Sequence, residues 1–190
     1  VCRGLEYAHN KKDKEGNELG IVHRDISPHN VLISRAGEVK LVDFGIAKAN
    51  FRLTQTKLGV VKGKFHYMAP EQIRGDEVDR RADIFALGSV AYEMLSGRKL
   101  FEAGSDQDLI ERVKNAELPP IRQNLAHVPD TIRTVVERAL IPLPNQRYSW
   151  ASDMAEDLQR SLSREDIFFG ATQTAEFMRT LCVEDYEKNK

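Results

Sequence analysis

Residues 79–96 limit the possible folds of this chain more than any other segment. Gly97 follows them, and a glycine after a periodic apolar run is a typical end of a helix. The predicted helix carries apolar side chains on nearly every face: Ile84, Phe85, Leu87, Val90, Tyr92, Met94 and Leu95. A helix with this pattern is buried on all sides. We therefore expect it to be the central helix of the domain.

Length and composition fit one globular domain. The chain has 190 residues, of which 41% are hydrophobic and 30% are charged, values that are ordinary for a soluble domain. A net charge of −1 gives no reason to expect a nucleic-acid or membrane partner. The two cysteines, Cys2 and Cys182, make no disulfide framework and favour a reducing, cytoplasmic setting. The longest apolar stretch, 84–95, is interrupted by Glu93 and is too short to span a bilayer.

The start of the chain has the pattern of a helix interior. Residues 5–9 are typical of the last turns of a helix, and a charged loop follows at 11–20. No methionine or signal peptide precedes them. This pattern indicates that the chain begins at a cut rather than at a natural terminus.

Further helices are expected after the central one. The predicted ranges are 109–116, 129–140 and 149–162. Ser105 is expected to cap the first of them and Ser149 the third. Beyond Ser163 the apolar pattern weakens into an acidic tail, with a short helix expected near 175–183.

A β-hairpin is expected before the central helix. Two segments have strand composition, 31–34 and 39–42. With 35–38 as the loop, Val31 pairs with Val42. One step further out, Asn30 then lies beside Asp43, roughly 5 Å away. Two oxygen-bearing side chains are thus predicted to converge at the open end of the hairpin.

Residues 46–66 form a basic segment with five lysines and arginines and no acidic residue. Gly59 and Gly63 interrupt it, and Gly45 precedes it. We expect a long, mobile loop, and loops of this length are usually functional.

Four motifs stand in order along the chain. His23-Arg24-Asp25 begins the pattern H-R-D-x-x-x-x-N, which ends at Asn30. Asp43-Phe44-Gly45, Ala69-Pro70-Glu71 and an aspartate-to-glycine motif at 83–88 follow it. Together they resemble the catalytic loop, the magnesium motif, the activation-segment end and the buried helix of protein kinases. Each tripeptide alone is a weak signal, whereas the ordered set is specific.

The resemblance covers residues 1–162, and it implies the fold and the domain boundaries. It implies a mainly α-helical, protein-kinase-like C-terminal lobe with one small β-hairpin, and 163–190 as a tail or linker. The N-terminal lobe, with its Gly-rich loop, strand lysine and helix glutamate, is absent from this chain. We therefore expect the chain by itself to be inactive and poorly soluble.

The resemblance also implies the chemistry of the site. Asp25 accepts the proton of a substrate hydroxyl. Asn30 and Asp43 bind Mg²⁺ and, through it, ATP, because magnesium prefers carboxylate, amide and phosphate oxygens. Pro28 keeps Ser27 out of helical conformation and the loop extended.

Structural and regulatory roles follow from the same resemblance. Four residues resemble structural positions of the family: His23 packs beneath the catalytic loop, Asp83 ties the backbone of that loop to the buried helix, and Glu71 pairs with Arg147. Arg24 resembles the arginine that receives a phosphate from the activation loop. Thr54 and Thr56 are the expected acceptors, because a phosphate would reverse the repulsion between their basic segment and Arg24. The alternative for Thr54 and Thr56 is that they are ordinary loop threonines. The separate alternative for Arg147 is that it is a surface arginine.

Two positions depart from the family pattern. Ser27 stands where these kinases usually have lysine, and Lys64 stands where they usually have threonine. We interpret the pair as an exchange in which Lys64 supplies the cation near the transferred phosphate and Ser27 supplies the hydroxyl near Asp25. The alternative is that Lys64 is one more solvated lysine. Ser-Pro at 27–28 and Ala-Pro-Glu-Gln at 69–72 resemble bacterial kinases of this type.

The expected function is transfer of the γ-phosphate of Mg-ATP to serine or threonine hydroxyls on proteins, by a cytoplasmic or membrane-anchored kinase. One rival is a pseudokinase scaffold, although both Asp25 and Asp43 are in place. A second is a small-molecule kinase of the aminoglycoside type, which lacks a long activation segment like 54–71. Tyrosine specificity is less expected, because tyrosine kinases usually have Ala-Ala-Arg at the positions of Ser27-Pro28-His29.

Overall fold

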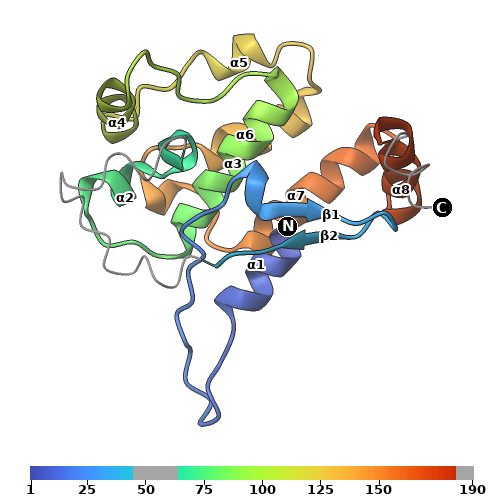
Figure 1. Cartoon of the computed structure of the whole chain (residues 1–190), viewed down its shortest axis with the longest axis horizontal. Helices are drawn as coiled ribbons and strands as arrows, with labels where there is room; N and C mark the ends of the chain where they lie inside the picture. Colours follow the sequence, from blue (N-terminus) through green and yellow to red (C-terminus); the bar gives the residue numbers. More distant parts are fainter. Residues whose placement is uncertain (45–63, 183–190) are drawn as a thin grey trace.

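The computed structural model of the protein describes residues 1–44 and 64–182 (Figure 1). Within these ranges the α-helices are α1 (Cys2–His9), α2 (Pro70–Arg74), α3 (Arg80–Ser96), α4 (Asp106–Lys114), α5 (Ile121–Asn124), α6 (Asp130–Ala139), α7 (Ala151–Arg164) and α8 (Ala171–Leu181). The 3₁₀ helices are η1 (Pro28–Asn30), η4 (Lys64–Tyr67) and η5 (Pro144–Gln146). Strands β1 (Val31–Ile33) and β2 (Val39–Leu41) form an antiparallel hairpin. The expectation of a mainly helical lobe with one small hairpin is confirmed for these residues. None of these helices is both long and apolar enough to cross a membrane.

Helix α3 is the central helix, as its sequence predicts. The Asp79 side chain caps its first turn by accepting from the Arg81 N–H, and Gly97 ends it with a φ of 70°. Its residues divide between two core clusters, with Phe85 in one and Ile84 in the other. Figure 1 shows α3 between α2 and α4 on one side and α1 and α7 on the other. The all-round apolar pattern is required because α3 contributes to both cores.

The last turn of α3 departs from this pattern. Met94 was expected to be buried, but its side chain is 80% exposed. Leu95, its neighbour, packs against one core cluster. Since the core covers only one side of this turn, the opposite side carries Met94 into solvent.

Two of the later helices begin elsewhere than the sequence indicates. Ser105 caps α4 as predicted, through a bond from the Asp108 N–H. Helix α7, however, starts after Trp150 rather than Ser149, because the Asp153 carboxylate at the third helical position accepts from the Trp150 N–H at 3.2 Å. Helix α8 likewise starts at Ala171 rather than near 175. At this start the Gln173 side chain accepts from the Gly170 N–H. In both cases a side chain at the third position sets the start.

The predicted hairpin forms, but its register is shifted by one residue. Val31 pairs with Leu41, not with Val42. The turn holds three residues rather than four, because the Ser34 N–H donates to the Glu38 carbonyl at 2.8 Å. Gly37, with a φ of 79°, closes this turn, as is common in three-residue hairpin loops. The next pair outward is therefore Asn30 with Val42, and the predicted direct pairing of Asn30 with Asp43 is wrong.

The basic segment is only partly described. Residues 64–66, expected to belong to a mobile loop, lie in η4. The Phe65 side chain is 1% exposed and belongs to the core cluster around Phe85, so residues 64–66 are attached to the core. Residues 46–63 lie outside the described residues.

Candidate active site

The candidate catalytic loop, residues 23–30, is bound to α3 by one buried carboxylate. Asp83 is 1% exposed, and its two oxygens accept from the backbone N–H groups of His23 and Arg24, each at 2.8 Å. The same carboxylate accepts from Nε2 of His9 at 2.8 Å. Asp83 thus joins α1, α3 and the loop, which is the position the sequence analysis expects for it.

His23 links the loop to the residues after β2. Its ring is fully buried, with Nε2 3.1 Å from the Val42 carbonyl and Nδ1 3.3 Å from the Asp25 N–H. A carbonyl can only accept and a backbone N–H can only donate, so the imidazole carries its proton on Nε2. The ring centre also lies 4.4 Å from that of Phe44. His23 is therefore in a position to fix the relative placement of Asp25 and the Asp43-Phe44 pair.

Asn30 completes the connections of Asp25. Its side-chain amide donates to the Asp25 carbonyl at 2.6 Å, and its own carbonyl accepts from the Val42 N–H at 3.0 Å. Ser27, before Pro28, is extended with φ −157° and ψ 164°, as expected for a residue that precedes proline. The backbone of Asp25 is thus bound on its N–H side by His23 and on its C=O side by Asn30.

Asp43 follows the hairpin in an unusual backbone conformation. Its φ is 57° and its side chain is exposed. A positive φ is uncommon outside glycine, and it ends the strand pairing directly after Val42. Because Asn30 pairs with Val42, Asp43 remains a neighbour of Asn30 even though the two residues do not face each other in the ladder.

The oxygens of Asn30 and Asp43 fit a hard divalent cation. The Asn30 amino group is already bound to the Asp25 carbonyl, so its amide oxygen is the atom left for a ligand. Among the described residues there is no group of three or more histidine, cysteine or carboxylate side chains that could hold a metal. One amide and one carboxylate supply only two protein ligands. This number suits Mg²⁺, whose remaining ligands are then phosphate oxygens and water.

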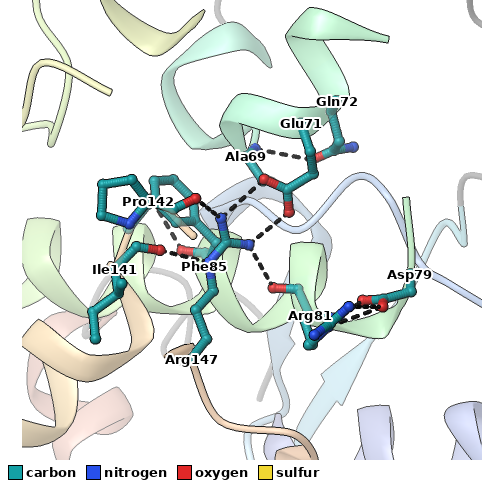
Figure 2. A network of polar contacts seen from close by, with 10 residues as sticks. Ala69, Glu71, Gln72, Asp79, Arg81, Phe85, Ile141, Pro142 and Arg147 are labelled. Atoms are coloured by element: carbon teal, nitrogen blue, oxygen red, sulfur yellow. Dashed lines mark hydrogen bonds and ion pairs between the residues drawn. The ribbon is translucent and has the colours of Figure 1, made fainter. Parts of the chain in front are cut away.

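Arg147 and Glu71 form a buried ion pair, shown in Figure 2. The guanidinium donates to the two carboxylate oxygens at 2.6 and 2.9 Å. It also donates to three backbone carbonyls, those of Ile141, Arg81 and Pro142. Arg147 is therefore not a surface arginine, and its five N–H groups join α2 and α3 to the segment before η5.

The chain matches the family described as "Protein kinase domain" over residues 1–160. It belongs to the protein kinase family. Among curated proteins it is 43% identical over 179 residues to the tyrosine-protein kinase MasK of Myxococcus xanthus, covering 94% of this chain and 28% of MasK. It is 38% identical over 145 residues to the serine/threonine-protein kinase PrkC of Bacillus subtilis, covering 76% of this chain and 22% of PrkC.

A third relative is the serine/threonine-protein kinase PknB of Mycolicibacterium smegmatis, 37% identical over 163 residues, with 84% of this chain and 25% of PknB covered. The chain therefore spans about a quarter of the length of the curated relatives it matches. The resemblance to bacterial Hanks-type kinases is confirmed by these relatives.

The end of the kinase activation segment is bound to α3 by Tyr67. Its phenol donates to the Glu93 carboxylate at 2.6 Å. Burial, together with this hydrogen bond to a negative group, raises the pKa of Tyr67 well above its ordinary value. The phenol thus stays protonated and remains a donor to Glu93.

The structure describes only part of the remaining candidate residues that the sequence predicts. Thr54 and Thr56 lie outside the described residues. Lys64 begins η4, but its side chain is outside what the structure describes. The side chain of Ser27 is 8% exposed. The exchange between Ser27 and Lys64 therefore stays a prediction.

The contact between His9 and Asp83 was not predicted from the sequence. The residues are 74 positions apart, and both side chains are 1% exposed. A weak signal was present, because His9 follows Leu5 and Ala8 on the buried face of α1. A polar residue on an apolar face needs a partner, but nothing in the local sequence identifies which.

Proposed function

We propose that the protein containing this chain transfers the γ-phosphoryl group of ATP, with Mg²⁺, to serine or threonine hydroxyls of other proteins. One observation carries the proposal: Asn30 bonds to the Asp25 carbonyl with its side chain and to the Val42 N–H with its backbone. A candidate base and two candidate magnesium ligands thus come from one hydrogen-bonded unit.

The residues divide the work as follows. The oxygen of the substrate hydroxyl bonds to the γ-phosphorus of ATP, and the bond between that phosphorus and ADP breaks. Asp25 accepts the proton that the hydroxyl loses. Asn30 and Asp43 bind Mg²⁺, which supplies charge neutralisation at the phosphate oxygens. His23 and Asp83 orient the loop but do not touch the substrate.

The use of ATP and the two free cysteines, Cys2 and Cys182, favour a cytoplasmic location for the domain.

Serine and threonine are favoured over tyrosine as acceptors. Ser27-Pro28-His29 stands where tyrosine kinases usually have Ala-Ala-Arg, and PrkC and PknB are named as serine/threonine kinases. MasK, which is named a tyrosine kinase, is the observation in favour of the second candidate.

Arg24 and the two loop threonines are the proposed switch. Among the described residues, the Arg24 guanidinium has no ion-pair or hydrogen-bond partner, whereas the Arg24 backbone N–H donates to Asp83. A phosphate on Thr54 or Thr56 would give this guanidinium a partner of opposite charge. Mass spectrometry of active enzyme should find phosphate at one of them, and a Thr54→Ala/Thr56→Ala enzyme of full activity would contradict the switch.

The decisive experiment uses the full-length protein with labelled ATP, Mg²⁺ and a generic protein substrate. We expect label on serine and threonine by phosphoamino-acid analysis, and its loss in Asp25→Asn. Label on tyrosine alone would support the second candidate. No transfer by the wild type, with nucleotide binding retained, would support a pseudokinase instead.

A further inference from the structure

The peptide group that joins Arg24 to Asp25 is bound by side chains at both ends. Its C=O accepts from Nε2 of Gln72 at 3.1 Å, and its N–H donates to Nδ1 of His23 at 3.3 Å. The preceding N–H, that of Arg24, donates to Asp83. The orientation of this peptide plane sets the direction in which the chain enters Asp25, so its partners bear on the placement of the candidate base.

The backbone at this point needs external support. Arg24 has a φ of 64°, a region that residues other than glycine enter at a cost in free energy. Such a conformation persists only where surrounding contacts over-determine it. Three side chains, Asp83, His23 and Gln72, provide those contacts. Asp83 and His23 belong to the four family motifs, whereas Gln72 directly follows one of them, Ala69-Pro70-Glu71.

Gln72 makes two different hydrogen bonds from α2. Its Oε1 accepts from the Ala69 N–H at 3.0 Å (Figure 2), which caps the helix start, while its Nε2 donates to the Arg24 carbonyl. Glutamate and glutamine serve equally as the capping residue at this position of a helix. Only glutamine also has a donor. The second bond therefore explains why an amide, rather than a carboxylate, stands here.

The helix that carries Gln72 is firmly attached to the core. Glu71, the preceding residue, is 5% exposed and pairs with Arg147. Ile73, the following residue, is 6% exposed. Gln72 thus projects from a fixed element, as a residue that orients another group must.

We propose that Gln72 is a positioning residue for the phosphoryl-transfer reaction, which orients the Arg24–Asp25 peptide and so couples the end of the activation segment to the candidate base. The proposal rests on the proposed kinase function. Gln72 does not touch the reacting atoms. It acts through the Arg24 carbonyl, and this distinguishes it from a residue that only caps α2.

The variant that separates the two roles is Gln72→Glu in the full-length protein. Glutamate keeps the acceptor for the Ala69 N–H and loses the donor to Arg24. We expect kcat to fall about tenfold, with KM for ATP and for protein substrate within twofold and the melting temperature of the domain unchanged. Gln72→Ala loses both bonds, so both kcat and the melting temperature should fall. Gln123→Glu, which adds the same charge at an exposed site on α5, should match the wild type.

A second measurement does not depend on activity or on the proposed function. Amide hydrogen exchange of residues 24–27 should be at least tenfold faster in Gln72→Glu than in the wild type, while exchange in α3 is unchanged. Kinetics within twofold of the wild type, or unchanged exchange at 24–27, would overturn the inference. If the wild type transfers no phosphate, the proposed function fails while the exchange result still decides the role of Gln72.

Discussion

At the scale of single residues, the buried polar side chains of residues 1–44 and 64–182 have hydrogen-bond partners, except at two nitrogens, Nδ1 of His9 and Nε of Arg133. Asp83 is the clearest case, because its carboxylate accepts three hydrogen bonds, from His9, His23 and Arg24. A carboxylate can be buried only when such donors replace water. Within the described part of the chain, Nδ1 of His9 is buried without a partner. The other ring nitrogen, Nε2, contacts Asp83 at 2.8 Å.

Arg147→Lys tests how much the buried ion pair stabilises the domain. Lysine keeps the charge but cannot reproduce five bonds that diverge from a planar guanidinium. Leaving Glu71 and the carbonyls with too few donors should lower the free energy of unfolding by about 3 kcal/mol. The unfolding transition of the kinase domain in urea measures this loss of free energy of unfolding.

The matched control for this change is Arg160→Lys on α7. Arg160 is 66% exposed in its side chain and faces Glu156 and Asp157 at the surface. Exposed pairs contribute roughly 0–1 kcal/mol, so its substitution should leave the urea midpoint almost unchanged. Equal losses in the two variants would contradict the importance of burial.

Lys64→Met tests the proposed exchange of cation and hydroxyl. If Lys64 offsets charge on the transferring phosphate, the substitution removes a donor that stabilises the transition state by about 3 kcal/mol. We therefore expect kcat to fall about a hundredfold. The double variant Ser27→Lys/Lys64→Thr restores the usual family arrangement and should recover much of the rate. Steady-state kinetics of the full-length enzyme provide the measurement. A Lys64→Met enzyme within threefold of wild type would show that Lys64 is only a solvated loop lysine.

At the scale of elements, the hairpin of β1 and β2 is connected at both of its ends. Its open end carries Asn30 and Val42, and its turn meets α8. A Cβ on Gly37 would lie 1.9 Å from the Ala171 carbonyl oxygen and 2.8 Å from the Ala175 nitrogen. Figure 1 shows α8 beside the tip of the hairpin. The segment after residue 163, expected to be a tail with a short helix near 175–183, thus includes a helix in backbone contact with the hairpin.

Gly37→Ala should displace α8. Its Cβ would overlap the backbone of α8, which cannot move aside as a flexible side chain could. We expect faster hydrogen exchange across 171–181 and earlier proteolysis between α7 and α8. Gly75→Ala is the control, because Gly75 has a similar φ of 77° but nothing within 4 Å of its added Cβ. It should cost about 1 kcal/mol from backbone strain alone and leave α8 protected.

At the scale of the whole molecule, α3 joins the parts that would otherwise be separate. It contributes Phe85 and Tyr92 to one core cluster and Ile84 and Leu87 to the other. Gly88 lets α6 approach closely, since a Cβ there would lie 2.9 Å from the Ala139 Cβ. Unfolding of α3 therefore exposes both clusters at once.

Hydrogen exchange should reflect this arrangement. Amides in the middle of α3 should exchange only through global unfolding, and those of the exposed loop 11–20, whose hydrogen bonds are local, should exchange much faster through local opening. Mass-spectrometric exchange over hours measures both segments in one experiment. Comparable protection in the two segments would contradict the central role of α3.

The sequence by itself determined the features that depend on local patterns. The apolar pattern of 79–96, which Gly97 follows, was enough to place α3. The ordered motifs were enough to identify the family and to name Asp25, Asn30 and Asp43 as the candidate site. Propensity, capping and motif spacing act over a few residues, and so they can be read from a single chain.

Only the tertiary structure decided the register of the hairpin and the partners of the buried polar groups. A bond within a three-residue turn shifted the strand pairing by one residue, and this moved Asp43 out of direct opposition to Asn30. His9 meets Asp83 across 74 positions, and Gln72 meets Arg24 across 48. Many donors and acceptors are chemically suited to one another. Which of them pair depends on how the helices pack, because packing alone brings distant residues within hydrogen-bonding distance.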